Sequence, residues 1–132
     1  MATPAELRQE IDSIRNQVEQ YEFAARRAKA GVTRGSRDLD DEGWVSNYPA
    51  ETFQAQVMEP CKTAQERLAE AIPALKKAVQ DLREARLSPE NRRPLTSNLQ
   101  NVKSKVHDAA RDIGELKTRV DVLQARGSEG IW

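Results

Sequence analysis

Residues 95–123, LTSNLQNVKSKVHDAARDIGELKTRVDVL, decide the fold of this chain. Apolar side chains recur in this stretch at alternating intervals of four and three residues: Leu95, Leu99, Val102, Val106, Ala109, Ile113, Leu116, Val120 and Leu123. A repeat averaging about 3.5 residues keeps one apolar stripe of an α-helix against a partner helix as the two supercoil. The stretch therefore predicts a long helix over about residues 95–126, packed through a coiled-coil seam.

The first part of the chain carries the same ladder. Its members are Leu7, Ile11, Ile14, Val18, Tyr21, Ala25, Ala28 and Val32. The preceding Thr3-Pro4-Ala5-Glu6 has the spacing of a capping box, with proline at the first helical position. Gly31 is the natural stop, because glycine commonly follows the last residue of a helix. We therefore predict a helix over about residues 4–30.

A third ladder occupies the middle of the chain and predicts a helix over about residues 49–87. Its members are Phe53, Val57, Cys61, Ala64, Leu68, Ile72, Leu75, Val79 and Leu82. Pro60 and Pro73 each remove a backbone hydrogen bond, so we expect the helix to be kinked at both.

These elements predict one all-α domain that spans residues 1–132. Short connections make consecutive helices antiparallel neighbours. The simplest assembly is an elongated antiparallel three-helix bundle, or coiled coil, with up-down-up topology. It is joined by a loop over 31–48 and a turn over 88–94, and it ends in a tail over 127–132.

The composition argues against several classes of function. The 21 basic residues balance the 21 acidic ones, whereas nucleic-acid binding draws its affinity from excess positive charge. No apolar run approaches the roughly 20 residues that span a bilayer, and no secretory leader is recognisable. We therefore expect no nucleic-acid partner, no membrane span and a cytoplasmic location, with leaderless export as an alternative.

The sequence also carries no pattern typical of catalysis. His107 is the only histidine and lies among charged residues, and Cys61 is the only cysteine, which we expect to be a small core residue. Cysteine and histidine clusters with zinc spacing are absent, as is a glycine-rich phosphate loop. We predict that the chain is not an enzyme and binds no cofactor or metal.

The aromatic residues suggest a site. All six would fall towards the end of the bundle that bears the 31–48 loop: Tyr21, Phe23, Trp44, Tyr48, Phe53 and Trp132. Either the loop and tail fold back and plug this end, or the aromatic residues bind a partner, because Trp and Tyr dominate interface hot spots. The acidic run that contains Asp40 and Asp41 would then steer a basic partner. The candidate partner-binding residues are Phe23, Trp44, Tyr48, Trp132, Asp40 and Asp41.

Together these features favour a non-enzymatic protein–protein interaction module, such as an adaptor, a chaperone-like subunit or a scaffold component. It would act through its helix faces and the aromatic end. The expected partner is a protein with a basic surface or another coiled coil, and a homo-oligomer is an alternative. A different class of function, a small-molecule binder, would need a pocket opened by kinks at Pro60 and Pro73.

One family shares some of these features. A long first helix, a tryptophan in the connection (Trp44) and a second amphipathic helix are similar to the small Trp-x-Gly hairpin proteins of type VII secretion. The resemblance implies a small helical effector or partner protein. The chain departs from the family pattern because Trp44-Val45-Ser46 lacks the glycine, a third helix is present, and the tail lacks the Tyr-x-x-x-Asp/Glu motif.

Overall fold

The structure, a computed structural model, describes residues 2–42 and 50–128, with only the backbone for residues 39–42 and 128. Its elements are α1 (Pro4–Glu42), α2 (Ala50–Phe53), a π-helical turn (Gln54–Met58), α3 (Glu59–Glu84) and α4 (Pro89–Ser128). No strand occurs among these described residues. The predicted all-α class is confirmed for the part of the chain that the structure describes.

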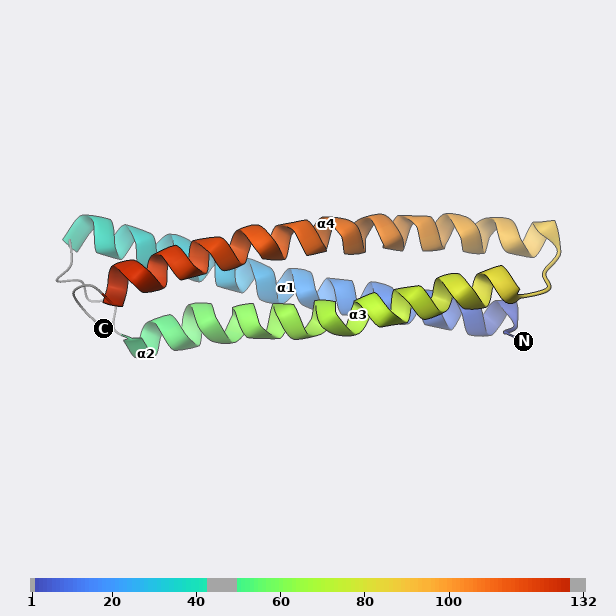
Figure 1. Cartoon of the computed structure of the whole chain (residues 1–132), viewed down its shortest axis with the longest axis horizontal. Helices are drawn as coiled ribbons and strands as arrows, with labels where there is room; N and C mark the ends of the chain where they lie inside the picture. Colours follow the sequence, from blue (N-terminus) through green and yellow to red (C-terminus); the bar gives the residue numbers. More distant parts are fainter. Residues whose placement is uncertain (1, 43–49, 129–132) are drawn as a thin grey trace.

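The helices form three long rods that lie side by side (Figure 1). Because α2, the π-helical turn and α3 follow one another without a break, they make up a single rod. Figure 1 shows α1 and α4 running in the same direction and α3 running in the opposite one. At about 1.5 Å per residue, the 39 residues of α1 and the 40 of α4 are each about 60 Å long.

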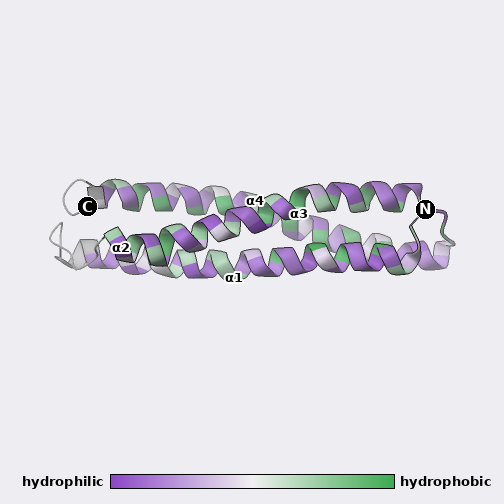
Figure 2. Cartoon of the chain, turned by 90° about the horizontal axis from the view of Figure 1, so that it is seen from below, coloured by the Kyte–Doolittle hydropathy of each residue, from purple (hydrophilic) through white to green (hydrophobic). Residues whose placement is uncertain are grey.

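The core lies along the apolar stripes that the rods turn towards one another. Every member of the ladder in α1 is buried, and in α4 every ladder position is buried except the half-buried Ile113. Figure 2 shows hydrophobic and hydrophilic residues alternating along each ribbon, as expected for helices that bury one stripe. Among the side chains that the structure describes, Tyr21 is the largest that is fully buried.

The start of α1 follows the predicted capping box. The Thr3 hydroxyl accepts a hydrogen bond from the Glu6 amide and donates one to the Glu6 carboxylate, both at 3.2 Å. The predicted end of this helix is wrong, because α1 continues through Gly31 to Glu42. A Cβ on Gly31 would lie 2.9 Å from Val57 Cγ2 and closer still to the Gln56 carbonyl oxygen. Gly31 therefore allows a close contact between helices instead of ending one.

The predicted 31–48 loop is correspondingly wrong over residues 31–42, which are helical. Residues 43–49 lie outside the described part of the chain. At the other end, α4 begins at Pro89, ahead of the predicted Leu95, because the Ser88 carbonyl accepts amide hydrogen bonds from Asn91 and Arg92. It also extends to Ser128, so the predicted tail is helical at 127 and 128, and 129–132 are not described.

The seam in α3 differs from the predicted one. Ile72 is 37% exposed and Val79 is half-buried, whereas the neighbouring Ala71 and Ala78 are buried. From Leu68 the buried positions continue in steps of three and four through Ala71. The irregular pair of four-residue steps lies earlier, beside the π-helical turn, whose wider i→i+5 hydrogen bonding accommodates an extra residue.

The prolines do not break the helix into separate segments. Pro60 lies directly after the π-helical turn, in the first turn of α3, and Pro73 lies inside the continuous helix. Bent axes at these two residues stay a prediction. None of the helices in the described ranges combines the length and apolar character of a bilayer-spanning segment.

Candidate functional site

The structure places Phe23 away from the predicted aromatic end. Phe23 is 65% exposed and lies in the middle of α1, 19 residues and about 28 Å before the helix ends at Glu42. The expected grouping of Phe23 with the end of the bundle is therefore wrong, because that prediction rested on a helix that stopped at residue 30. Its outward orientation agrees with its position off the seam.

The other predicted site residues are less fully described. Trp44, Tyr48 and Trp132 lie outside the described residues. Asp40 and Asp41 belong to the last turn of α1 by their backbone, and their side chains are not described. The two aromatic residues that the sequence analysis did not select, Tyr21 and Phe53, are buried in the core.

Phe23 lines a surface groove between α1 and α3 with a volume of about 610 Å³. On the α1 side it is accompanied by Gln20 and Arg27, and the facing residues of α3 include Pro60 and Arg67. Glu19 and Glu59 also line the groove, so its lining carries both signs of charge. We call this surface the Phe23 groove.

A second groove, of about 520 Å³, lies between α3 and α4. Its apolar lining consists of Ile72, Leu75, Val79, Val106 and Ala110. Its basic rim consists of four exposed residues, Lys76, Arg83, Lys103 and His107. Gln80 is the remaining lining residue, so none of the residues that line this α3–α4 groove carries a carboxylate.

This distribution of charge differs from that of other grooves on the molecule. A groove of about 760 Å³ between α1 and α3 is lined by four carboxylates, Glu6, Glu10, Asp81 and Glu84, and by Lys77. The Phe23 groove is mixed in charge. A chain of zero net charge thus presents a purely basic rim around the apolar lining between α3 and α4.

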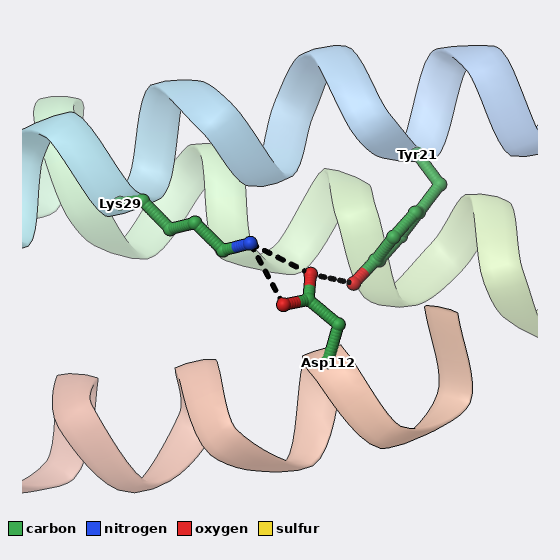
Figure 3. Close-up of polar contacts among 3 residues, drawn as sticks. All are labelled: Tyr21, Lys29 and Asp112. Atoms are coloured by element: carbon green, nitrogen blue, oxygen red, sulfur yellow. Dashed lines mark hydrogen bonds and ion pairs between the residues drawn. The ribbon is translucent and has the colours of Figure 1, made fainter. Parts of the chain in front are cut away.

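A polar cluster joins α1 to α4 (Figure 3). The Tyr21 hydroxyl donates to Asp112 Oδ2 at 2.6 Å, and Lys29 Nζ donates to both Asp112 oxygens at 2.7 and 2.9 Å. Desolvation raises the pKa of Asp112, but the hydrogen bonds from Lys29 and Tyr21 outweigh it and lower the pKa below its ordinary value. Burial and the same carboxylate raise the pKa of Tyr21. The cluster gives the buried Tyr21 hydroxyl a hydrogen-bond partner and links α1 to α4.

A second polar cluster joins α1 to α3. Lys77 Nζ donates to Glu10 Oε1 at 2.6 Å and to Asp81 Oδ2 at 2.7 Å. Desolvation raises the pKa of Glu10, whose other oxygen is buried without a hydrogen-bond partner, while the bond from Lys77 lowers the pKa of Asp81. One ammonium therefore holds two carboxylates together at the helix interface.

Cys61 and the metal-ligating residue types were also located in the described part of the chain. Cys61 is buried in the core as predicted, and burial raises the pKa of its thiol, which disfavours the nucleophilic thiolate. Across residues 2–42 and 50–128, no group of three or more His, Cys, Asp or Glu side chains is placed to hold a metal ion.

Comparison of the chain with protein-family models, with curated proteins and with solved structures found no match.

Sequence reasoning missed the α3–α4 groove, although a signal was present. At two points of the ladder, two adjacent apolar residues could each be the buried one. These pairs are Ala71 with Ile72 and Ala78 with Val79. Choosing the larger residue placed both Ile72 and Val79 in the core. Such adjacent pairs indicate that a helix carries a second, outward apolar stripe beside its buried one.

Proposed function

We propose that this chain is a non-enzymatic protein–protein interaction module that acts through its helix faces, as an adaptor or scaffold component. In this proposal the rods form an antiparallel, up-down-up three-helix coiled coil that serves as a stiff support for exposed side chains. The proposal places the protein in the cytoplasm.

The observation that carries the proposal is the 65% exposure of Phe23 in the groove between α1 and α3. Burial of a fully exposed phenylalanine side chain is worth roughly 1.5–3 kcal/mol, so a partner that covers the ring would gain much of that free energy. Aromatic residues with a surrounding polar rim are typical of interface hot spots. The groove offers such a rim because Arg27, Arg67 and Glu59 lie around the ring.

A site-specific crosslinking experiment tests the proposal. A photoreactive phenylalanine analogue is incorporated at position 23 in the source cell, and crosslinked products are identified by mass spectrometry. We expect the analogue to form a discrete adduct with another protein or with a second copy of this chain. The matched control places the analogue at Arg26, which is exposed on α1 and does not line the Phe23 groove.

The Phe23→Ala variant provides a second test, which compares stability with partner binding. Because the ring is mostly exposed, its removal is expected to change the free energy of unfolding by less than about 1 kcal/mol. The same variant should lose the captured partner in a pull-down. The proposal is rejected if position 23 yields no more adducts than position 26, or if Phe23→Ala leaves capture of every partner unchanged.

A further inference from the structure

We infer that the α3–α4 groove is a docking site for an acidic amphipathic helix of another protein. This surface is separate from the Phe23 groove, since the two share no lining residue. The inference rests on the shape of the groove, on its apolar lining and on the single sign of its charge.

The dimensions of the groove suit a helix. Its lining residues on α3 extend from Ile72 to Arg83, a rise of about 16 Å, or roughly three helical turns. On α4 they recur at Lys103, Val106 and Ala110, in helical steps of three and four. A trough between two neighbouring helices accepts the apolar ridge of a third, which anchors through side chains at i, i+3 or i+4, and i+7.

The apolar lining supplies the contact area that such anchors need. Ile72 is 37% exposed and Val79 is half-buried, so both retain apolar surface that the core of this chain does not cover. Leu75 and Val106 are buried and close the base of the trough. An aliphatic residue from a partner helix would complete the packing around Ile72 and Val79.

The basic rim selects the charge of the occupant. Lys76 and Arg83 on α3 and Lys103 on α4 are cationic, and no lining residue is acidic. A helix whose flanking positions carry Glu or Asp would meet opposite charge along its length, whereas a basic helix would be repelled. Complementary charge of this kind steers association and excludes wrong partners.

Two other anionic occupants fit the groove less well. Single-stranded nucleic acid binds by stacking its bases on aromatic rings, and the apolar lining is wholly aliphatic. A bilayer surface is flat and would meet the basic rim without reaching the recessed Leu75 and Val106. A helical peptide buries the apolar lining and pairs with the rim at the same time.

A designed peptide tests the inference. The probe is a fluorescein-labelled amphipathic peptide of about 20 residues with Leu at heptad positions a and d and Glu at e and g, which disfavours pairing with itself. One control peptide has Lys in place of Glu, and another has Ser in place of Leu. Fluorescence anisotropy should give micromolar binding of the acidic Leu peptide and at least about tenfold weaker binding of both controls.

Matched variants locate the binding surface. Ile72→Glu should weaken binding of the acidic peptide at least about tenfold, whereas Val122→Glu, at an exposed valine of α4 outside the groove, should change it less than about twofold. The double variant Lys76→Glu/Lys103→Glu should weaken binding similarly. Its control with equal net charge is Lys62→Glu/Lys117→Glu, at exposed lysines outside the groove. Urea unfolding verifies that each variant is folded.

Several outcomes would overturn the inference. One is that the acidic Leu peptide does not bind. Another is that the Lys or the Ser peptide binds as tightly as the acidic Leu peptide. A third is that the control variants lose as much peptide binding as the groove variants. Displacement of the peptide by oligo(dT) or by anionic vesicles at lower concentration would assign the groove to nucleic acid or lipid. If light scattering shows that the protein self-associates and that Ile72→Glu abolishes this, the groove binds a second copy of the chain. The Phe23→Ala variant should bind the peptide as tightly as the parent protein. A negative peptide result would therefore reject the α3–α4 docking site without rejecting the function proposed for the Phe23 groove.

Discussion

Gly31 of α1 packs directly against the backbone of Gln56 in the π-helical turn. A Cβ at Gly31 would lie 2.9 Å from the Gln56 carbonyl carbon and closer still to its oxygen, a separation that real Cβ atoms essentially never show. Nearby, Arg34 Nη1 donates to Gln56 Oε1 at 2.9 Å, so the two helices are held together at this level. The close approach of α1 to the π-helical turn therefore depends on a residue without a side chain.

Gly31→Ala is therefore expected to destabilise the protein. Alanine favours a helix by up to about 1 kcal/mol over glycine, but overpacking against a backbone carbonyl typically costs about 1–3 kcal/mol. The matched control is Gly114→Ala in α4, where a Cβ would meet nothing within 4 Å. This substitution should raise the free energy of unfolding by about 0.5–1 kcal/mol. Urea unfolding compares the two variants. A stabilised Gly31→Ala variant would contradict the close packing.

The Asp112 cluster predicts a pH-dependent contribution to stability. Because the folded-state pKa of Asp112 is below its unfolded value, its stabilisation is complete above the ordinary aspartate pKa. That contribution is lost as the pH falls through the lowered folded-state pKa. Asp112→Asn should therefore be clearly less stable than the parent at about pH 7, and the difference should shrink towards about pH 3.

The control for this experiment is Asp108→Asn, one turn earlier on α4. Asp108 is exposed and pairs with Arg111 within the same helix, so its loss should change the free energy of unfolding by less than about 0.5 kcal/mol. Urea titrations at several pH values measure both variants. A gap between the parent and Asp112→Asn that stays constant down to pH 3 would show that the carboxylate charge does not contribute.

Lys77 should matter because its ammonium bridges two carboxylates. In Lys77→Met, Glu10 and Asp81 would face each other without the ammonium that bridges them. The folded-state pKa of Glu10, already raised by burial, should rise further, so protonation would favour the folded state. The variant is expected to lose stability at neutral pH and to regain part of it as the pH falls. Lys76→Met, at an exposed neighbour, serves as the control; identical pH profiles would refute the bridging role.

The ladders predicted the helical character of the chain because burial of one stripe dictates a 3.5-residue period. They did not predict where α1 ends, because glycine both terminates helices and allows close packing. Val32, Gly35 and Leu39 continue the four-three spacing beyond Gly31, and this continuation was the stronger signal. Contact with Gln56, a residue 25 positions away in the chain, cannot be inferred from local pattern.

The candidate site was less predictable. The exposure of Phe23 agrees with its absence from the apolar ladder, but its location along the molecule depended on the length of α1. The interpretation of Trp44, including the resemblance to the Trp-x-Gly proteins, stays a prediction because Trp44 lies outside the described residues. The α3–α4 groove depends on which of two adjacent apolar residues enters the core, and packing decides that choice.

Substitutions at 71 and 72 test the corrected seam. Ala71 is fully buried, so Ala71→Leu should overpack the core and cost about 1–3 kcal/mol. Ile72 is partly exposed, so Ile72→Ala should cost less than about 1 kcal/mol, compared with roughly 2–5 kcal/mol for Leu68→Ala or Leu116→Ala at buried positions. Urea unfolding of all four variants provides the measurement. If Ile72→Ala cost as much free energy of unfolding as Leu68→Ala, Ile72 would belong to the buried seam, as the sequence predicted.

Arg92 connects the start of α4 to the end of α3 and gives a final prediction. Its Nη1 donates to the Leu82 carbonyl at 2.9 Å, and its Nη2 donates to the Ala85 carbonyl. These carbonyls lie at the C-terminal end of α3, where helical partners run out, and the planar guanidinium can reach both at once. Arg92→Met should leave both without this donor and cost roughly 1–3 kcal/mol, and Arg92→Lys should restore only part of the loss because an ammonium lacks the fork geometry. The control is Arg93→Met at the exposed neighbour, which should change the free energy of unfolding by less than about 0.5 kcal/mol. An equal loss of stability in Arg92→Met and Arg93→Met would show that Arg92 does not cap the helix.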